Sequence, residues 1–154
     1  MRVIIYSIIF LIVSGCGFKI INQSENQRYK INEIEFEGEK RINYFIQNKL
    51  LKKSNNENSN IEITLFVTTK KNKTIKEKNI KNEITKYEIL ITSSVIAKTL
   101  DNDTYKFSVS NNGDYTVSEQ NSITINNEKK LIKILSQDIA DKIITELDLT
   151  INDL

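Results

Sequence analysis

A stripe of aliphatic residues near the C-terminus constrains the fold of this chain most. It begins after Glu128 and repeats mostly at spacings of three and four residues, which is the period of one helix face, over about five turns. Asn126 or Asn127 is expected to cap this helix, with Glu128 in its first turn. The stripe residues are Leu131, Ile132, Leu135, Ile139, Ile143 and Leu147. A helix with such a face needs a second layer to cover it.

A second amphipathic helix is predicted over residues 39–53. Its apolar residues again fall at spacings of three and four, while the charged and amide residues occupy the other positions. The stripe comprises Ile42, Phe45, Ile46 and Leu50. We interpret it as a core face rather than a ligand groove, since that is the usual role of an amphipathic helix.

Four segments carry strand patterns. Residues 29–36 are rich in β-branched and aromatic residues and end at Glu37 and Gly38, while residues 61–68 alternate strictly between an aliphatic phase and a more polar one. Residues 83–100 form a long strand whose middle has apolar residues in both phases, so we expect it to be covered on both sides. A turn at 101–103 leads to a return strand over 104–110.

A second turn is expected at Asn111–Asp114, followed by a short extension through Tyr115 and Val117. The order is thus strand, helix, three strands and helix. Two striped helices need a sheet face, and the hairpin makes that sheet at least partly antiparallel. The predicted fold is α+β, with two helices packed on one face of a mostly antiparallel four-stranded sheet in a two-layer sandwich.

The N-terminus has the features of a lipoprotein signal. Arg2 precedes an apolar run from Val3 to Val13 that is shorter than the roughly 20 residues of a membrane span. Small residues at 14 and 15 then precede Cys16, the single cysteine of the chain. The pattern predicts S-diacylglycerol and N-acyl modification at Cys16, and several acyl chains make a lasting anchor. An uncleaved helical anchor and an ordinary signal peptide are the alternatives.

The domain organisation follows from this signal. Residues 1–15 are expected to be removed, and residues 16–28 form the lipidated N-terminus and a polar tether. Residues 29–154 then form a single α+β domain, long enough to bury a core.

The composition excludes most kinds of catalytic site. The chain has no histidine, and lipidation would use its one thiol, which excludes Ser-His and Cys-His catalysis and most zinc sites. Its four glycines form no phosphate-binding motif, and a net charge of +2 is too small for a nucleic-acid-binding field. No cofactor, metal, nucleic acid or enzymatic activity is therefore expected, although carboxylates and Ser/Lys pairs remain as candidates that no spacing singles out.

The run Gly15-Cys16-Gly17-Phe18, the expected order of elements and the overall length resemble the LPS-assembly lipoprotein LptE family. The resemblance implies a non-enzymatic plug inside the lumen of the outer-membrane β-barrel LptD, which helps lipopolysaccharide reach the cell surface. Gly17 favours the outer membrane, on its periplasmic side, since in enteric bacteria an Asp at this position tends to retain lipoproteins in the inner membrane.

Six lysines crowd the expected connection between the second and third strands. They are Lys70, Lys71, Lys73, Lys76, Lys78 and Lys81. We hypothesise that Lys70, Lys71 and Lys73 contact the phosphates of lipid A or acidic sugars. A solvated, lysine-rich hairpin end is the alternative. For the whole protein, the alternatives are a free-standing lipoprotein that binds a small ligand or scaffolds another envelope complex and, last, an enzyme.

Overall fold

The structure is a computed structural model that describes residues 29–53 and 61–152 of the 154-residue chain. The expected signal peptide, Cys16 and the tether of 16–28 lie outside the described residues, so those assignments stay predictions.

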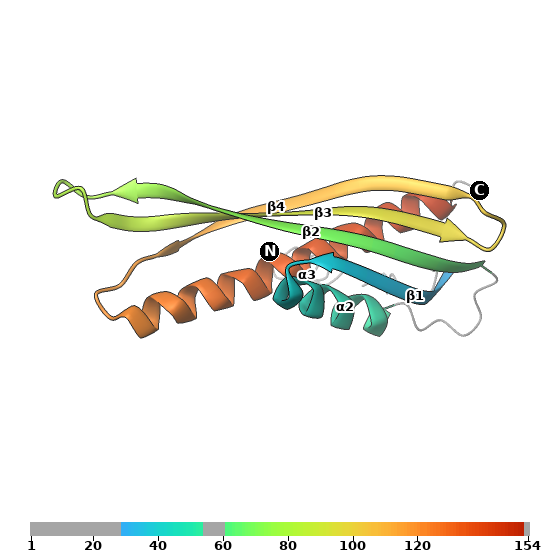
Figure 1. Ribbon diagram of the computed structural model, residues 1–154, viewed down its shortest axis with the longest axis horizontal. Helices are drawn as coiled ribbons and strands as arrows, with labels where there is room; N and C mark the ends of the chain where they lie inside the picture. Colours follow the sequence, from blue (N-terminus) through green and yellow to red (C-terminus); the bar gives the residue numbers. More distant parts are fainter. Residues whose placement is uncertain (1–28, 54–60, 153–154) are drawn as a thin grey trace, which may run out of the picture.

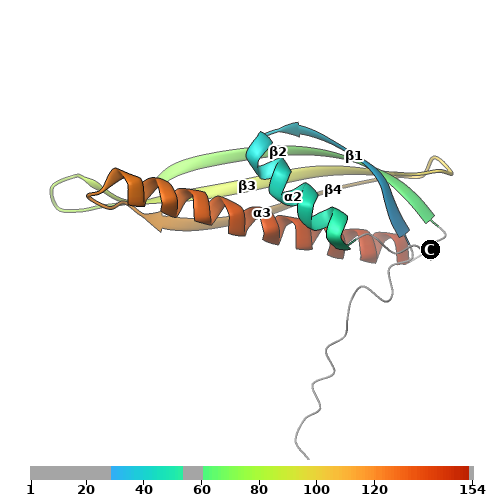
Figure 2. The same ribbon diagram turned by 90° about the horizontal axis from the view of Figure 1, so that it is seen from below.

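Two helices cover one face of a four-stranded sheet (Figures 1 and 2). The elements are β1 (Tyr29–Gly38), α2 (Lys40–Lys53), β2 (Ile61–Lys78), β3 (Ile84–Thr99), β4 (Thr104–Thr116) and α3 (Asn121–Asn152). The sheet order is β1-β2-β3-β4, with β1 parallel to β2 and the other two pairs antiparallel. The predicted α+β two-layer arrangement is confirmed, and the sheet is mixed because α2 returns the chain between two parallel strands.

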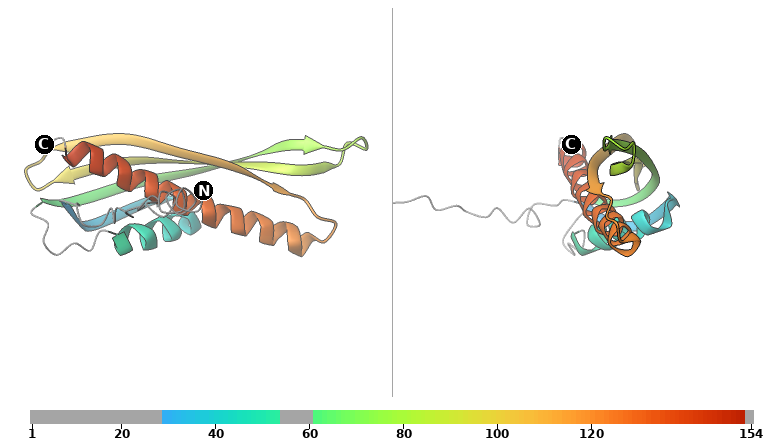
Figure 3. Two further views of the ribbon diagram at one scale, coloured as in Figure 1. Left: turned by 180° about the vertical axis from the view of Figure 1, so that it is seen from behind. Right: turned by 90° about the vertical axis from the view of Figure 1, so that its left-hand side faces the viewer.

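The core lies between the sheet and the helices. In β2 the predicted alternation buries Ile63, Leu65 and Val67. Ile139 and Ile143 of α3 are fully buried and belong to the same core cluster. The strands are curved when the molecule is seen from its end (Figure 3). Lys49 and Lys53 of α2 both form ion pairs with Asp141 of α3, which joins the two helices beside the core. None of the described helices is long and apolar enough to cross a bilayer.

The predicted start of the C-terminal helix is wrong. Helix α3 begins at Asn121, so Asn126 and Asn127 lie inside it rather than at its cap. The start is instead held by Ser118 and Thr124, since the Ser118 N–H donates to Thr124 Oγ1 over 2.8 Å and the Thr124 hydroxyl donates to the Ser118 carbonyl over 3.2 Å.

The expected turn at Asn111–Asp114 is part of β4, because all four residues continue the pairing with β3. The expected covering of β3 on both sides is also wrong. Leu90 is 40 % exposed, since both helices lie on the opposite face of the sheet.

A polar corner ends β1 and starts α2. Gly38 has φ of +99°, and the next residue, Glu39, donates its N–H to Thr69 Oγ1 over 3.1 Å. The Thr69 hydroxyl in turn donates to Asn43 Oδ1 over 2.6 Å, and the Asn43 amide reaches the Glu37 carbonyl at 3.4 Å. The pairing of β1 with β2 stops here, at Gly38 and Thr69, so β2 continues without β1 beside it.

Candidate functional site

A cleft opens where β1 stops. It lies between the first turn of α2, the continuing strand β2 and the N-terminal half of α3, and it has a volume of about 270 Å³. Its lining residues are Glu39, Arg41, Ile42, Lys71, Ile125, Glu128, Lys129 and Ile132. The early end of β1 therefore creates a concave site from three elements that are distant in the sequence.

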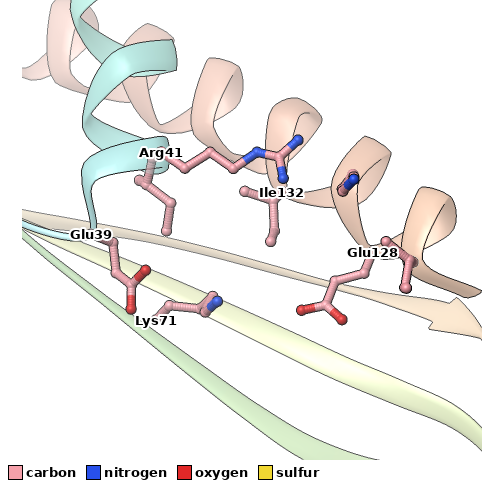
Figure 4. A pocket seen from close by; sticks show the side chains of 8 residues that line it. Glu39, Arg41, Lys71, Glu128 and Ile132 are labelled. Atoms are coloured by element: carbon pink, nitrogen blue, oxygen red, sulfur yellow. The ribbon is translucent and has the colours of Figure 1, made fainter.

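The cleft combines an apolar floor with a charged rim. Ile42 and Ile132 are buried, whereas Ile125 is 43 % exposed. Around them stand three cations and two carboxylates, and in the view of Figure 4 the side chain of Lys71 lies between those of Glu39 and Glu128. Among the described residues, Arg41, Lys71 and Lys129 have no ion-pair partner within 4 Å.

One of the two carboxylates already has partners. Glu128 Oε2 accepts hydrogen bonds from Lys73 Nζ and from the Tyr115 hydroxyl, both over 2.9 Å. Lys73 also lies over the aromatic rings of Tyr87 and Tyr115, with its Nζ 4.3 and 5.3 Å from their centroids. Burial alone would raise the pKa of Glu128. The hydrogen bonds from Lys73 and Tyr115, together with the positive charges of Lys73 and Lys71, outweigh burial and lower that pKa below its ordinary value.

The predicted lysine cluster is not a loop. Strand β2 pairs with β3 as far as Lys78 and Ile84, so five of the six lysines lie on the strand and Lys81 alone lies in the turn. The prediction that they crowd a connection is wrong. The local composition is typical of a loop, but β3 supplies backbone hydrogen-bond partners to this segment, and the composition of the segment alone does not show that partner strand.

The three lysines that were predicted to contact lipid A phosphates do not lie together in the structure. Lys71 and Lys73 continue the helix-facing phase of Val67 and Thr69, whereas Lys70 falls in the opposite phase, on the uncovered face. Lys71 lines the cleft, and Lys73 is bound to Glu128. Lys70, Lys71 and Lys73 therefore do not form one cationic patch.

Sequence reasoning missed Arg41, Glu128 and Lys129 as site residues. In the sequence, Arg41 falls on the polar side of a helical stripe, and Glu128 and Lys129 precede the C-terminal stripe. From such positions the sequence does not show whether a charged side chain lines a cleft or lies in open solvent. Within residues 29–53 and 61–152, no group of three metal-binding side chains comes together.

The contacts of Glu128 with Lys73 and Tyr115 predict that stability depends on pH. Because its pKa is lowered in the folded protein, the Glu128 carboxylate stabilises the fold above its ordinary pKa, and this contribution disappears as the pH falls through the lowered value. Between pH 7 and pH 3 we expect the wild type to lose about 1 kcal/mol more unfolding free energy than Glu128→Gln, the size of a partly exposed ion pair. Urea unfolding at both pH values measures this difference. An equal loss in both proteins would contradict it.

The comparisons with known proteins give structural neighbours alone. No family model and no curated protein matches the chain. The fold is similar to rare lipoprotein B from Shewanella oneidensis, with 14% identity, 79% of this chain and 98% of that chain covered and a TM-score of 0.58. It is also similar to an uncharacterized lipoprotein B from Nitrosomonas europaea, with 14% identity, 88% of this chain and 93% of that chain covered and a TM-score of 0.61. A minor lipoprotein from Acinetobacter baumannii has 13% identity, with 80% of this chain and 93% of that chain covered and a TM-score of 0.54. The chain thus shares its fold with bacterial lipoproteins.

Proposed function

We propose that this chain is a non-catalytic, LptE-type lipoprotein, anchored through Cys16 on the periplasmic side of the outer membrane. It forms a plug and assembly complex with an LptD-like β-barrel and assists the insertion of lipopolysaccharide into the outer leaflet. The observation that carries this proposal is the coincidence of two independent features. Residues 2–16 have the sequence pattern of a lipoprotein signal, and the fold is similar to structures of bacterial lipoproteins.

The uncovered face of the sheet suits a plug. Its central rows carry short hydroxyl side chains. Thr68, Ser94 and Ser108 lie side by side in neighbouring strands, and in the next row Thr92 and Ser110 lie beside Lys70. The interior of an outer-membrane barrel is polar. The hydroxyl groups of these rows can exchange hydrogen bonds with such a wall.

Lipopolysaccharide contact through Lys70, Lys71 and Lys73 remains part of this proposal. Their ammonium groups would meet anionic phosphates as point charges. Because Lys70 and Lys71 lie on opposite faces of β2, they would contact different parts of the ligand or different ligands.

The test is purification of the tagged chain from native membranes in mild detergent, with mass spectrometry of the intact protein and its companions. We expect a triacylated chain that begins at Cys16, in a roughly equimolar complex with a large β-barrel. Cys16→Ala should lose the acyl mass and most of the membrane-bound fraction, because the sulfur is the site of the first lipid. Ser14→Ala, which keeps a small residue in the signal, should be processed like the wild type. An unmodified wild-type chain would refute the anchor.

The second candidate is a free-standing lipoprotein that binds a small ligand or scaffolds another envelope complex. The cleft beside Lys71 favours this alternative, because it joins an apolar floor to a charged rim. A lipidated chain recovered without a barrel would make it the working function.

A further inference from the structure

We propose that the open edge of β2 binds an extended, acidic segment of a partner protein as an added strand. The open edge comprises residues 70–78 of β2, on the side where β1 no longer pairs. β1 pairs with β2 only as far as Gly38 and Thr69, and in the described part of the chain no other strand takes its place beyond that point (Figure 2). The proposal does not require the barrel partner proposed above.

The backbone of this edge has free hydrogen-bonding groups. Successive residues of a strand direct their N–H and C=O groups to opposite sides. The carbonyl oxygen of Thr69 points toward β1, because it would lie 2.1 Å from a Cβ added at Gly38. By this alternation the backbone groups of Lys71, Lys73 and Ile75 point to the same side, where they have no hydrogen-bond partner among the described residues. An added strand binds to such a row of groups.

The other edge of the sheet is closed by side chains of α3. Lys142 donates to the Ser110 carbonyl over 2.6 Å, and the Asn127 amide donates to the Thr116 carbonyl over 3.2 Å. Ser110 and Thr116 belong to β4. Side chains that cover an edge hinder the approach of another strand. We therefore place the added strand at β2 rather than at β4.

The charge of the open edge selects an acidic partner. Lys70 and Lys71 are neighbours on opposite faces of β2, and neither has an ion-pair partner within 4 Å among the described residues. The Cβ atoms of directly opposite residues in paired strands lie roughly 4.5–5.5 Å apart, so two consecutive acidic residues of an added strand would meet both lysines. A second copy of this chain would bring lysines next to lysines, which is unfavourable.

The helix-facing side of the added strand would lie over the cleft described above. Lys71 lines this cleft together with Arg41 and Lys129, so an acidic side chain opposite Lys71 would enter a cationic site. Four residues along the same face, Ile75 is 51 % exposed, and an aliphatic residue of the partner would cover it. The expected segment therefore has two consecutive acidic residues and an aliphatic residue four positions from the acidic residue that faces the helices.

The test is deuterium exchange of the full chain in a non-ionic detergent, followed for each amide by NMR. The probe is a synthetic peptide in which alternating Thr and Val residues flank two central glutamates on both sides, so that it can pair in either direction. The N–H groups of Lys71, Lys73 and Ile75 should exchange at least tenfold more slowly with saturating peptide, because they gain partners. Those of Lys70 and Asn72, which point to β3, should not change.

Two outcomes of this experiment would overturn the proposal. Slower exchange in both sets of amides, or in neither, would mean that the peptide does not pair with the open edge. No binding at about 1 mM peptide would refute it equally.

Methylated peptides test the backbone pairing independently of charge. N-methylation of alternate amides removes the donors on one side of the peptide and keeps both glutamates. Of the two possible phases of methylation, only one faces β2. One methylated peptide should therefore bind at least tenfold more weakly than the parent peptide, and the other should bind within threefold of it. Equal affinities of the two methylated peptides would mean that no strand is formed.

Matched lysine variants locate the site. Lys71→Gln should raise the dissociation constant of the peptide about tenfold, as expected for loss of one charged hydrogen bond. Lys106→Gln removes the same charge from β4, at the other edge of the sheet, and should change the dissociation constant less than twofold. Similar weakening by both variants would show a general electrostatic attraction and refute the open edge as the site.

The exchange experiment without peptide tests the other occupant, a second copy of the chain. Exchange at Lys71, Lys73 and Ile75 should not depend on the protein concentration. Protection that rises with protein concentration would show that two copies pair at this edge and would refute the acidic partner. Failure of peptide binding leaves the barrel partnership intact, and failure of the co-purification leaves the open edge intact.

Discussion

Gly38→Ala is expected to lower the free energy of unfolding by about 2–5 kcal/mol. Two effects add up. A left-handed backbone conformation costs an L-residue about 1–2 kcal/mol. Overpacking by the new methyl group typically costs about 1–3 kcal/mol more. Gly38 has φ of +99°, and an added Cβ would lie 2.1 Å from the Thr69 carbonyl oxygen. That oxygen belongs to the backbone of β2 and can move only if the β1–β2 ladder moves with it.

Urea unfolding of the purified chain in detergent measures this loss, and Gly113→Ala is its control. Gly113 lies in β4 without a positive φ, and its added Cβ would meet the end of the Leu131 side chain at 2.9 Å. Because that side chain can change rotamer, we expect an effect below about 1 kcal/mol. Similar losses in the two variants would mean that the corner at Gly38 has no special role.

The consequence for the cleft can be separated from the loss of stability. Gly38 stands where β1 leaves the sheet and α2 begins, so its substitution should displace Glu39 and Arg41 as well. In the folded fraction of Gly38→Ala, the Glu39 N–H, which donates to Thr69 Oγ1 in the wild type, should exchange with deuterium faster than in the wild type.

Ile139→Ala is expected to cost about 2–5 kcal/mol, the usual range for removing a large aliphatic side chain from a packed core. Ile139 is fully buried at the middle of α3, between the sheet and the rest of the core. Removal of three carbons there leaves a cavity that rigid strands on one side and α2 on the other cannot close. Chemical unfolding followed by circular dichroism measures this loss.

Ile134→Ala is the matched control on the same helix. Ile134 is 44 % exposed, so the same change removes little buried surface and should alter stability by about 0.5 kcal/mol or less. Equal effects at the two positions would mean that α3 does not bury the face described for it.

Together the two pairs test different layers of the structure. The glycine pair tests the backbone junction that ends β1, and the isoleucine pair tests the orientation of α3 on the sheet. The isoleucine and Gly113 variants change no residue that lines the cleft, whereas Gly38→Ala should displace Arg41.

Periodicity alone was sufficient for most of the fold. The stripe from Leu131 to Leu147 and the alternation from Ile61 to Val67 each describe a local property, namely which side chains share a face. Both faces are buried as predicted, and the two-layer arrangement follows because each needs the other. The turn at 101–103 was also predictable from its own residues, and Asn102 in this turn has φ of 67°.

Where pairing with a distant strand decides the conformation, the sequence was insufficient. Residues 111–114 have turn composition and the segment from Lys70 to Lys78 has loop composition, yet both are strands because each pairs with β3. The start of α3 at Asn121 depends on the Ser118–Thr124 hydrogen bonds rather than on the stripe that begins ten residues later.

The sequence by itself determined that two apolar helix faces and alternating strands would bury one another, and it predicted the lipid anchor at Cys16. Only the tertiary structure decided the candidate site. A one-residue step along β2 places Lys70 and Lys71 on opposite faces, and the end of β1 at Gly38 leaves the space that Arg41 and Lys129 surround. Local patterns record which side chains are apolar, but a cleft depends on where one strand stops beside another, and that is set by contacts between residues far apart in the chain.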